Sequence, residues 1–144
     1  MRQLLLVPLL VLMLCSAACA AEGIALVKNA SGDVSVKRAG EIVPVKQGDR
    51  LQAGDLLITG SGGRVGVIFH DGSVLSLKEN SFLQIKDFVF KPIEQEFKFN
   101  LFLKKGAALF ESGKIGKLAP DDFTFEIPEG SIGIRGTKFL IEVN

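Results

Sequence analysis

Apolar and polar residues alternate over short runs through most of the chain, and the alternation is clearest near its C-terminal end. Apolar residues take every second position on both sides of a glycine-containing turn: Ile132 and Ile134 before Arg135-Gly136-Thr137, and Phe139, Ile141 and Val143 after it. Period-two alternation over runs this short predicts half-buried β-strands. Because Gly136 can adopt a positive φ without a steric penalty, we expect the chain to reverse sharply there.

Similar short apolar runs recur along the chain, separated by turns rich in Gly, Asp and Asn. The expected strands are 24–28, 33–38, 42–45, 56–59, 64–70, 74–77, 82–85, 97–103, 107–110 and 123–127. Turn signals recur roughly every eight to twelve residues, and no window keeps a helical apolar period, which is typical of all-β domains. The pattern predicts an all-β fold of about a dozen short strands, in two packed sheets or a short β-roll or β-helix-like domain.

Four local features refine this prediction. Asp71-Gly72 suits a type I′ turn and therefore predicts a hairpin. Pro44 indicates a sheet edge or a strand end, because proline donates no ladder hydrogen bond. Phe102 falls on the strand face opposite Phe97 and Phe99, so it is exposed and indicates a partner surface if the sheet packs on one face only. Phe88–Gln95, which contains Pro92, is expected to be a loop.

The first residues of the chain have the features of an export signal. Arg2 supplies a positive charge, Leu4–Leu14 is an apolar run too short to span a bilayer, and Ala18-x-Ala20 fits signal peptidase I. We therefore expect residues 1–21 to be a cleaved signal helix and residues 22–144 to form one all-β domain without a transmembrane span. The expected location is the periplasm or the extracellular medium.

Cys19 allows an alternative, in which the chain is processed as a lipoprotein and anchored through this residue. Ala17 and Ala18 suit lipoprotein processing, whereas Ser16 stands where a Leu-like residue is usual, and we favour plain secretion. Cys15 is lost in either case. No disulfide can then form within the mature domain, which must be held together by its core.

Composition and charge exclude several classes of partner. Loss of Arg2 with the leader leaves 16 of the 17 Lys and Arg against 16 Asp and Glu. A neutral chain offers no electrostatic attraction for nucleic acid or anionic lipid. All 11 aromatic residues are Phe, and the absence of Trp and Tyr argues against a stacking platform for glycans.

The candidate binding residues each have an ordinary structural interpretation. Arg135, beside Gly136 and Thr137, has a guanidinium that can bind a partner carboxylate, but an internal ion pair in a tight turn is the simpler interpretation. Asp71 and Gly72 are a second candidate binding position, in the predicted hairpin turn. Phe102 also has two interpretations: it contacts a partner, or it packs within the domain.

The sequence gives little support for catalysis or for metal binding. Asp49, Asp55 and Asp71 lack the spacing of an EF-hand loop, so we interpret them as side chains that bond their own turns. His70 is the only histidine, which leaves too few ligands for structural zinc and no partner for a catalytic triad. We therefore expect no enzyme activity, no metal and no cofactor.

A set of motifs in a fixed order resembles the FecR domain family. The matching positions are Leu51-Gln52-Ala53-Gly54-Asp55 before a strand ending in Thr59, Arg64, Asp71-Gly72-Ser73, Leu77, Asn80-Ser81, Leu103 with Gly106 and Phe110, Phe123 with Pro128, and Gly133–Phe139. The resemblance implies a periplasmic sensor module. In the best-known arrangement, a transmembrane helix joins the domain to a cytoplasmic segment that acts on a sigma factor, and the protein relays the iron-siderophore occupancy of an outer-membrane transporter.

The sequence has neither an internal span nor a cytoplasmic segment of that kind, so we do not expect direct control of a sigma factor. The expected function is a non-catalytic, exported protein-interaction or sensing module of the bacterial cell envelope, whose partner is another envelope protein bound through an exposed strand edge. Two alternatives remain: a structural protein that self-assembles through open sheet edges, and a module that binds cell-wall glycans.

Overall fold

The computed structural model describes residues 23–133 and 138–144, and these residues form an all-β fold with very little helix. The expectation of an all-β domain with about a dozen strands is confirmed. The elements are β1 (Ala25–Ser31), β2 (Val34–Arg38), β3 (Glu41–Pro44), β4 (Arg50–Leu51), β5 (Leu56–Thr59), β6 (Arg64–Phe69), β7 (Val74–Leu77), β8 (Phe82–Lys91), β9 (Glu96–Glu111), α1 (Lys114–Leu118), the 3-10 turn η1 (Pro120–Asp122), β10 (Phe123–Ile127), β11 (Gly130–Ile132) and β12 (Lys138–Val143).

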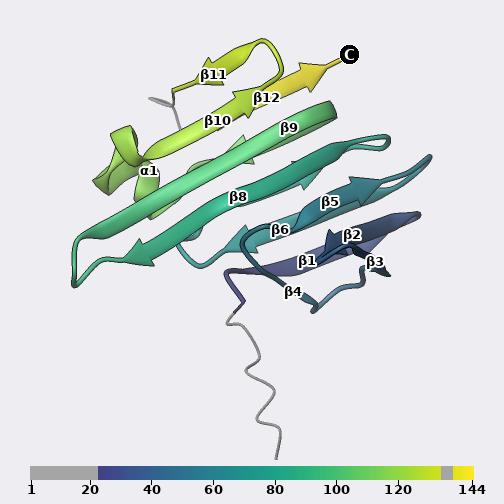
Figure 1. The fold of residues 1–144 in the computed structure, drawn as a ribbon, viewed down its shortest axis with the longest axis horizontal. Helices are drawn as coiled ribbons and strands as arrows, with labels where there is room; N and C mark the ends of the chain where they lie inside the picture. Colours follow the sequence, from purple (N-terminus) through teal and green to yellow (C-terminus); the bar gives the residue numbers. More distant parts are fainter. Residues whose placement is uncertain (1–22, 134–137) are drawn as a thin grey trace, which may run out of the picture.

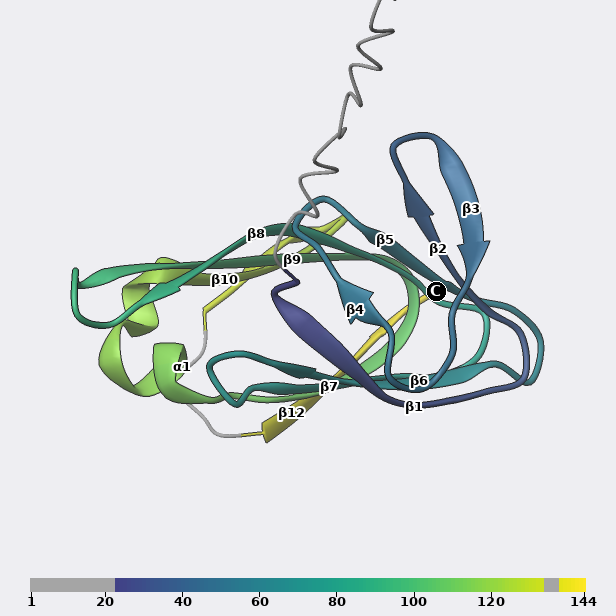
Figure 2. The ribbon, with the colours of Figure 1, turned by 90° about the horizontal axis from the view of Figure 1, so that it is seen from below.

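The strands form two layers that face each other, as Figure 2 shows from the side. Sheet A has the order β4-β1-β6-β7-β9-β12, and sheet B has the order β3-β2-β5-β8-β9-β10-β11. Most pairs are antiparallel, and β10 runs parallel to β9. β11 and β12, on either side of the expected reversal, belong to different sheets and do not pair with each other.

Strand β9 joins the two layers, because its first part belongs to sheet B and its second part to sheet A. Figure 1 shows it as the long strand that crosses the domain beside β8. Gly106 lies where the strand passes between the sheets and has a φ of +97°. A Cβ at this position would overlap Ser81, so glycine allows both the bend and the close approach of the loop before β8.

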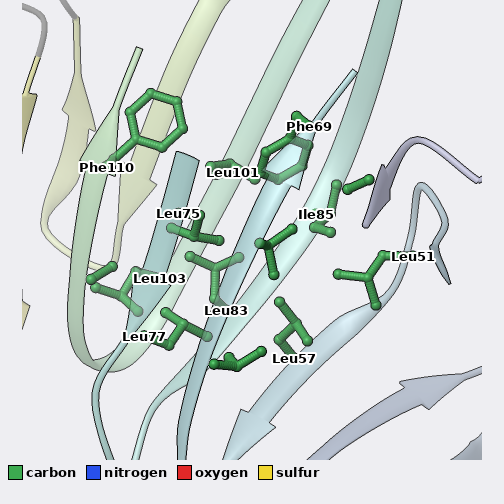
Figure 3. Packing of buried hydrophobic residues seen from close by; sticks show 14 of the residues in the cluster. Leu51, Leu57, Phe69, Leu75, Leu77, Leu83, Ile85, Leu101, Leu103 and Phe110 are labelled. Atoms are coloured by element: carbon green, nitrogen blue, oxygen red, sulfur yellow. The ribbon is translucent and has the colours of Figure 1, made fainter. Parts of the chain in front are cut away.

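The hydrophobic core lies between the two sheets and is filled by the inward-facing residues of every long strand (Figure 3). Leu57, Leu83 and Leu101 from sheet B are fully buried, as is Leu75 from sheet A. Phe99 is central to an aromatic cluster, with ring centroids 4.7 Å from Phe69, 4.9 Å from Phe88, 5.7 Å from Phe110 and 5.1 Å from Phe123. Helix α1 adds Ile115, which is also fully buried.

The predicted edge strand and hairpin are confirmed, and the expected loop is wrong in part. Pro44 lies in β3, the edge strand of sheet B, and β6 and β7 form the predicted hairpin around Asp71-Gly72. The turn is not of type I′, because only Gly72 has a positive φ, of +86°, and its amide bonds back to the carbonyl of Phe69. The expected loop at Phe88–Gln95 is wrong in its first half, because β8 continues to Lys91 and pairs with β9, whereas residues 92–95 do form the turn between the two strands. A bulge between Ile85 and Asp87 shifts the register and turns Phe88 into the core, so the strict alternation that the prediction followed is interrupted there.

No helix in residues 23–133 and 138–144 is long and apolar enough to cross a bilayer.

Candidate functional site

The outward side of sheet B carries two rows of side chains, one running across five strands and the other across six. Directly paired residues in a sheet point to the same face, so the strand register identifies each row. The first row is Pro44, Ser35, Ile58, Phe82 and Lys105, and the second is Ile42, Lys37, Leu56, Gln84, Phe102 and Glu126. We call these two rows the outer face.

Much of the outer face is apolar although it is turned away from the core. Ile42 is 66% exposed and Phe82 37% exposed, whereas Leu56, Ile58 and Phe102 are half-buried by their neighbours. Ile58 is directly paired with Phe82, Leu56 lies two residues before Ile58, and Phe102 is diagonal to Phe82, so these four residues form one patch. Ile42 lies beyond Lys37 in the same row. A contiguous apolar patch on a folded domain is typical of a binding surface.

Phe102 lies on this face, as its position in the alternating strand predicted. The amino group of Lys86 lies 5.9 Å from the centre of its ring, within the range of a cation–π interaction. Lys86 also forms an ion pair of 2.9 Å with Glu126 on β10. The hydrogen bond from Lys86 lowers the pKa of the Glu126 carboxyl, and a longer one from Asn100 acts in the same direction. Phe102 is therefore covered on one side by a cross-strand polar cluster.

The charged residues of the outer face that have no ion-pair partner are all basic. Lys37, Lys104 and Lys105 are exposed and form no ion pair within the described part of the chain, whereas Glu126 is already paired with Lys86. Lys104 belongs to neither row: the register shift opposite Phe82 and Leu83 makes it an extra, exposed residue beside Lys105, at the margin of the outer face. Positively charged side chains thus lie around the apolar patch.

Asp71 and Gly72, the second candidate binding position, lie in an internal hydrogen-bond network. The Asp71 side chain is buried, and its Oδ1 accepts from the Ser73 amide at 2.9 Å. Its Oδ2 accepts from the Ser73 hydroxyl at 2.8 Å and from the Ile115 amide at 3.2 Å. The first bond is the predicted Asx-type turn. The third satisfies an amide in the first turn of α1 from the distant β6–β7 turn, so Asp71 fixes this helix against the hairpin.

Asp55 and Asp49 also bond locally. Buried Asp55 accepts from the Gln52 amide at 2.8 Å and receives the Arg38 guanidinium as a fork, from Nε at 2.9 Å and from Nη2 at 2.6 Å. The hydrogen bond to Asp55 raises the pKa of Arg38 above its ordinary value. Asp49 accepts from the Lys46 amide at 3.0 Å. The three aspartates considered as a metal site thus hold three different turns.

The remaining candidates are separated from the outer face or lie outside the described residues. His70 is exposed beside a shallow hollow that also involves Leu26 and Arg50, and the carboxylate of neighbouring Asp71 is engaged by Ser73 and Ile115. Arg135, Gly136 and Thr137 lie outside the described residues. So does Cys19, the possible lipidation site.

The sequence predicted only Phe102 of the outer face, and its other apolar members were missed. A signal was present in the uninterrupted apolar run Leu56-Leu57-Ile58 and in the pair Phe82-Leu83. A strand with apolar residues on successive positions presents them on both faces, and this indicates a second contact surface. Which such residues meet depends on strand order, and the local sequence does not give that order.

Comparisons with known proteins give one family and one partial structural likeness. The model of the family described as "FecR protein" matches residues 55–144. The chain is also similar to a solved "Cell surface anchoring domain", at 26% identity and a TM-score of 0.45, over 46% of this chain and 90% of that one. No curated protein matches.

Proposed function

Because the chain belongs to the FecR protein family, we propose that it is a non-catalytic interaction module of the bacterial cell envelope that binds another envelope protein through its outer face. The family membership and the export signal of the sequence support the location, in the periplasm, secreted, or anchored through Cys19. The observation that carries the binding role is the apolar patch formed by Leu56, Ile58, Phe82 and Phe102, with exposed Ile42 beyond Lys37 in the same row.

The partner that fits this surface is a protein with an apolar surface surrounded by acidic residues. Apolar side chains of the patch provide the area to be removed from water. Lys37, Lys104 and Lys105 around it have no ion pair among the described residues, so carboxylates of a partner would be their counter-charges. The same lysines disfavour self-association through this face, because two copies would bring like charges together.

A pair of isoleucine variants tests this proposal. Ile42→Lys places a charge within the outer face, and Ile93→Lys makes the same change at the β8–β9 hairpin tip, where the side chain is 98% exposed. The full chain, expressed with its own leader, is cross-linked in intact cells. The captured envelope protein is then purified and titrated calorimetrically against each variant. We expect Ile42→Lys to weaken binding by at least about tenfold, a loss of about 1.4 kcal/mol, and Ile93→Lys to leave it unchanged.

A second pair tests the charge of the partner. Lys104→Glu reverses a charge at the margin of the outer face, and Lys117→Glu reverses one on α1, away from it. We expect only Lys104→Glu to slow association, with an effect that decreases as salt is raised. Equal binding by all four variants would overturn the proposal. Binding to anionic vesicles in place of a protein, or hydrolysis of the captured partner, would also overturn it.

A further inference from the structure

Among the described residues, the two sheets end in four edge strands, and three of them are poor templates for another strand. β4 has two residues and β11 has three, so each offers very few backbone groups. β3 has four, but it contains Pro44. β12 is the longest edge, with six residues, and it pairs only with β9 among the described residues. In Figure 1 it lies at the margin of the ribbon.

Pro44 blocks the β3 edge on its open side. The amide of Val45 donates to the carbonyl of Val34 in β2 at 3.0 Å. Successive residues of an antiparallel strand direct their backbone groups to opposite sides, so those of Pro44 face away from β2. The missing N–H of proline therefore falls where an added strand would need a donor, which is a common way to protect an edge. β12 has no proline.

The side chains of β12 alternate regularly between core and solvent. Phe139, Ile141 and Val143 face the core, and the last two are 7% and 6% exposed. Lys138, Leu140 and Glu142 point outward, and Leu140 is 55% exposed. Within the described ranges, neither Lys138 nor Glu142 forms an ion pair within 4 Å, so both charges are available to a neighbouring strand.

We propose that β12 pairs antiparallel with β12 of a second copy of this chain, with Leu140 opposite Leu140 of the partner subunit. Directly opposed residues of two paired strands point to the same face of the sheet. The allowed registers of one β12 against the other therefore differ by steps of two residues. The register centred on Leu140 places Lys138 opposite Glu142 of the partner subunit, twice by symmetry. The registers centred on Phe139 or Ile141 place Leu140 opposite a charge instead.

The neighbouring strand of sheet A extends this charge pattern. Glu111 of β9 is directly paired with Lys138 of β12. In the proposed dimer, Lys138 therefore lies between Glu111 of its own chain and Glu142 of the partner subunit. On the inner side, Phe139 faces Ile141 of the partner subunit, which continues the apolar side of the sheet across the junction. Both the outward-facing and the inward-facing residues of β12 thus oppose complementary residues of the same strand in the second copy, as a two-fold interface requires.

Charge reversal tests the register, with association measured by sedimentation equilibrium of the full chain. Lys138→Glu and Glu142→Lys each create two like-charge pairs, and we expect each to weaken dimerisation by about tenfold or more. The double variant Lys138→Glu/Glu142→Lys exchanges the charges and should recover dimerisation. An equimolar mixture of the two single variants should form heterodimers, because every opposed pair is then oppositely charged.

Lys46→Glu, in the connection between β3 and β4, is the control for net charge and should dimerise as the wild type does. Far-UV circular dichroism establishes that each variant is folded. Heterodimers in the mixture show that the β12 edge of each single variant can still pair with another strand. A wild-type chain that stays monomeric at millimolar concentration would overturn the proposal. So would a dimer that is insensitive to both single reversals, or a mixture that fails to associate.

Discussion

Replacing Asp71 by alanine should destabilise the domain strongly, although the residue lies in a turn that the sequence made a candidate binding position. The Asp71 carboxylate is 1% exposed and accepts from the amides of Ser73 and Ile115 and from the Ser73 hydroxyl. Alanine leaves both amides buried without an acceptor, at about 1–3 kcal/mol each. We therefore expect a loss of about 4 kcal/mol, a large part of the 5–15 kcal/mol typical of a domain.

Urea unfolding followed by far-UV circular dichroism measures this loss, since the chain has neither Trp nor Tyr for fluorescence. Asp71→Asn retains one oxygen and should lose about half as much free energy of unfolding. Asp121→Ala, at an exposed position in η1, is the matched control and should stay within about 0.5 kcal/mol of the wild type. An Asp71→Ala variant within about 1 kcal/mol of the wild type would refute the structural role of this carboxylate.

Two further predictions concern ion pairs. Arg38→Ala leaves buried Asp55 with the Gln52 amide, so we expect a loss of about 2 kcal/mol in the free energy of unfolding, moderated because Arg38 is 37% exposed. Arg38→Lys, which lacks the fork, should be intermediate, and urea titrations showing no difference among the three proteins would contradict this. Because the pKa of Glu126 is lowered in the folded state, its ionised carboxyl stabilises the fold at pH values above 4.5, the ordinary pKa of the group. This contribution disappears as the pH falls through the lower pKa of the folded state. The stability difference between the wild type and Glu126→Gln, measured as the urea midpoint, should therefore be larger at about pH 6 than at about pH 3, and a constant difference would count against the Lys86–Glu126 pair.

The sequence determined the local character of each strand. Alternation in β9 separated Phe102 from Phe99, and alternation in β12 placed Phe139 and Ile141 on one face. Asp71-Gly72 specified a hairpin turn, because glycine permits a positive φ, and Pro44 specified an edge, because proline donates no backbone hydrogen bond. The export signal and the candidate Arg135-Gly136-Thr137 site stay predictions, since both lie outside the described residues.

Only the tertiary structure decided which strands are neighbours, and the outer face follows from that order. Ile42 and Phe102 are 60 positions apart in the sequence, yet β3, β2, β5, β8 and β9 bring them into one row. The role of Asp71 was equally hidden, because its carboxylate accepts from a helix amide 44 residues away. Alternation identifies the face of each strand from backbone geometry, whereas strand order arises from the packing of the whole core, which no local pattern encodes.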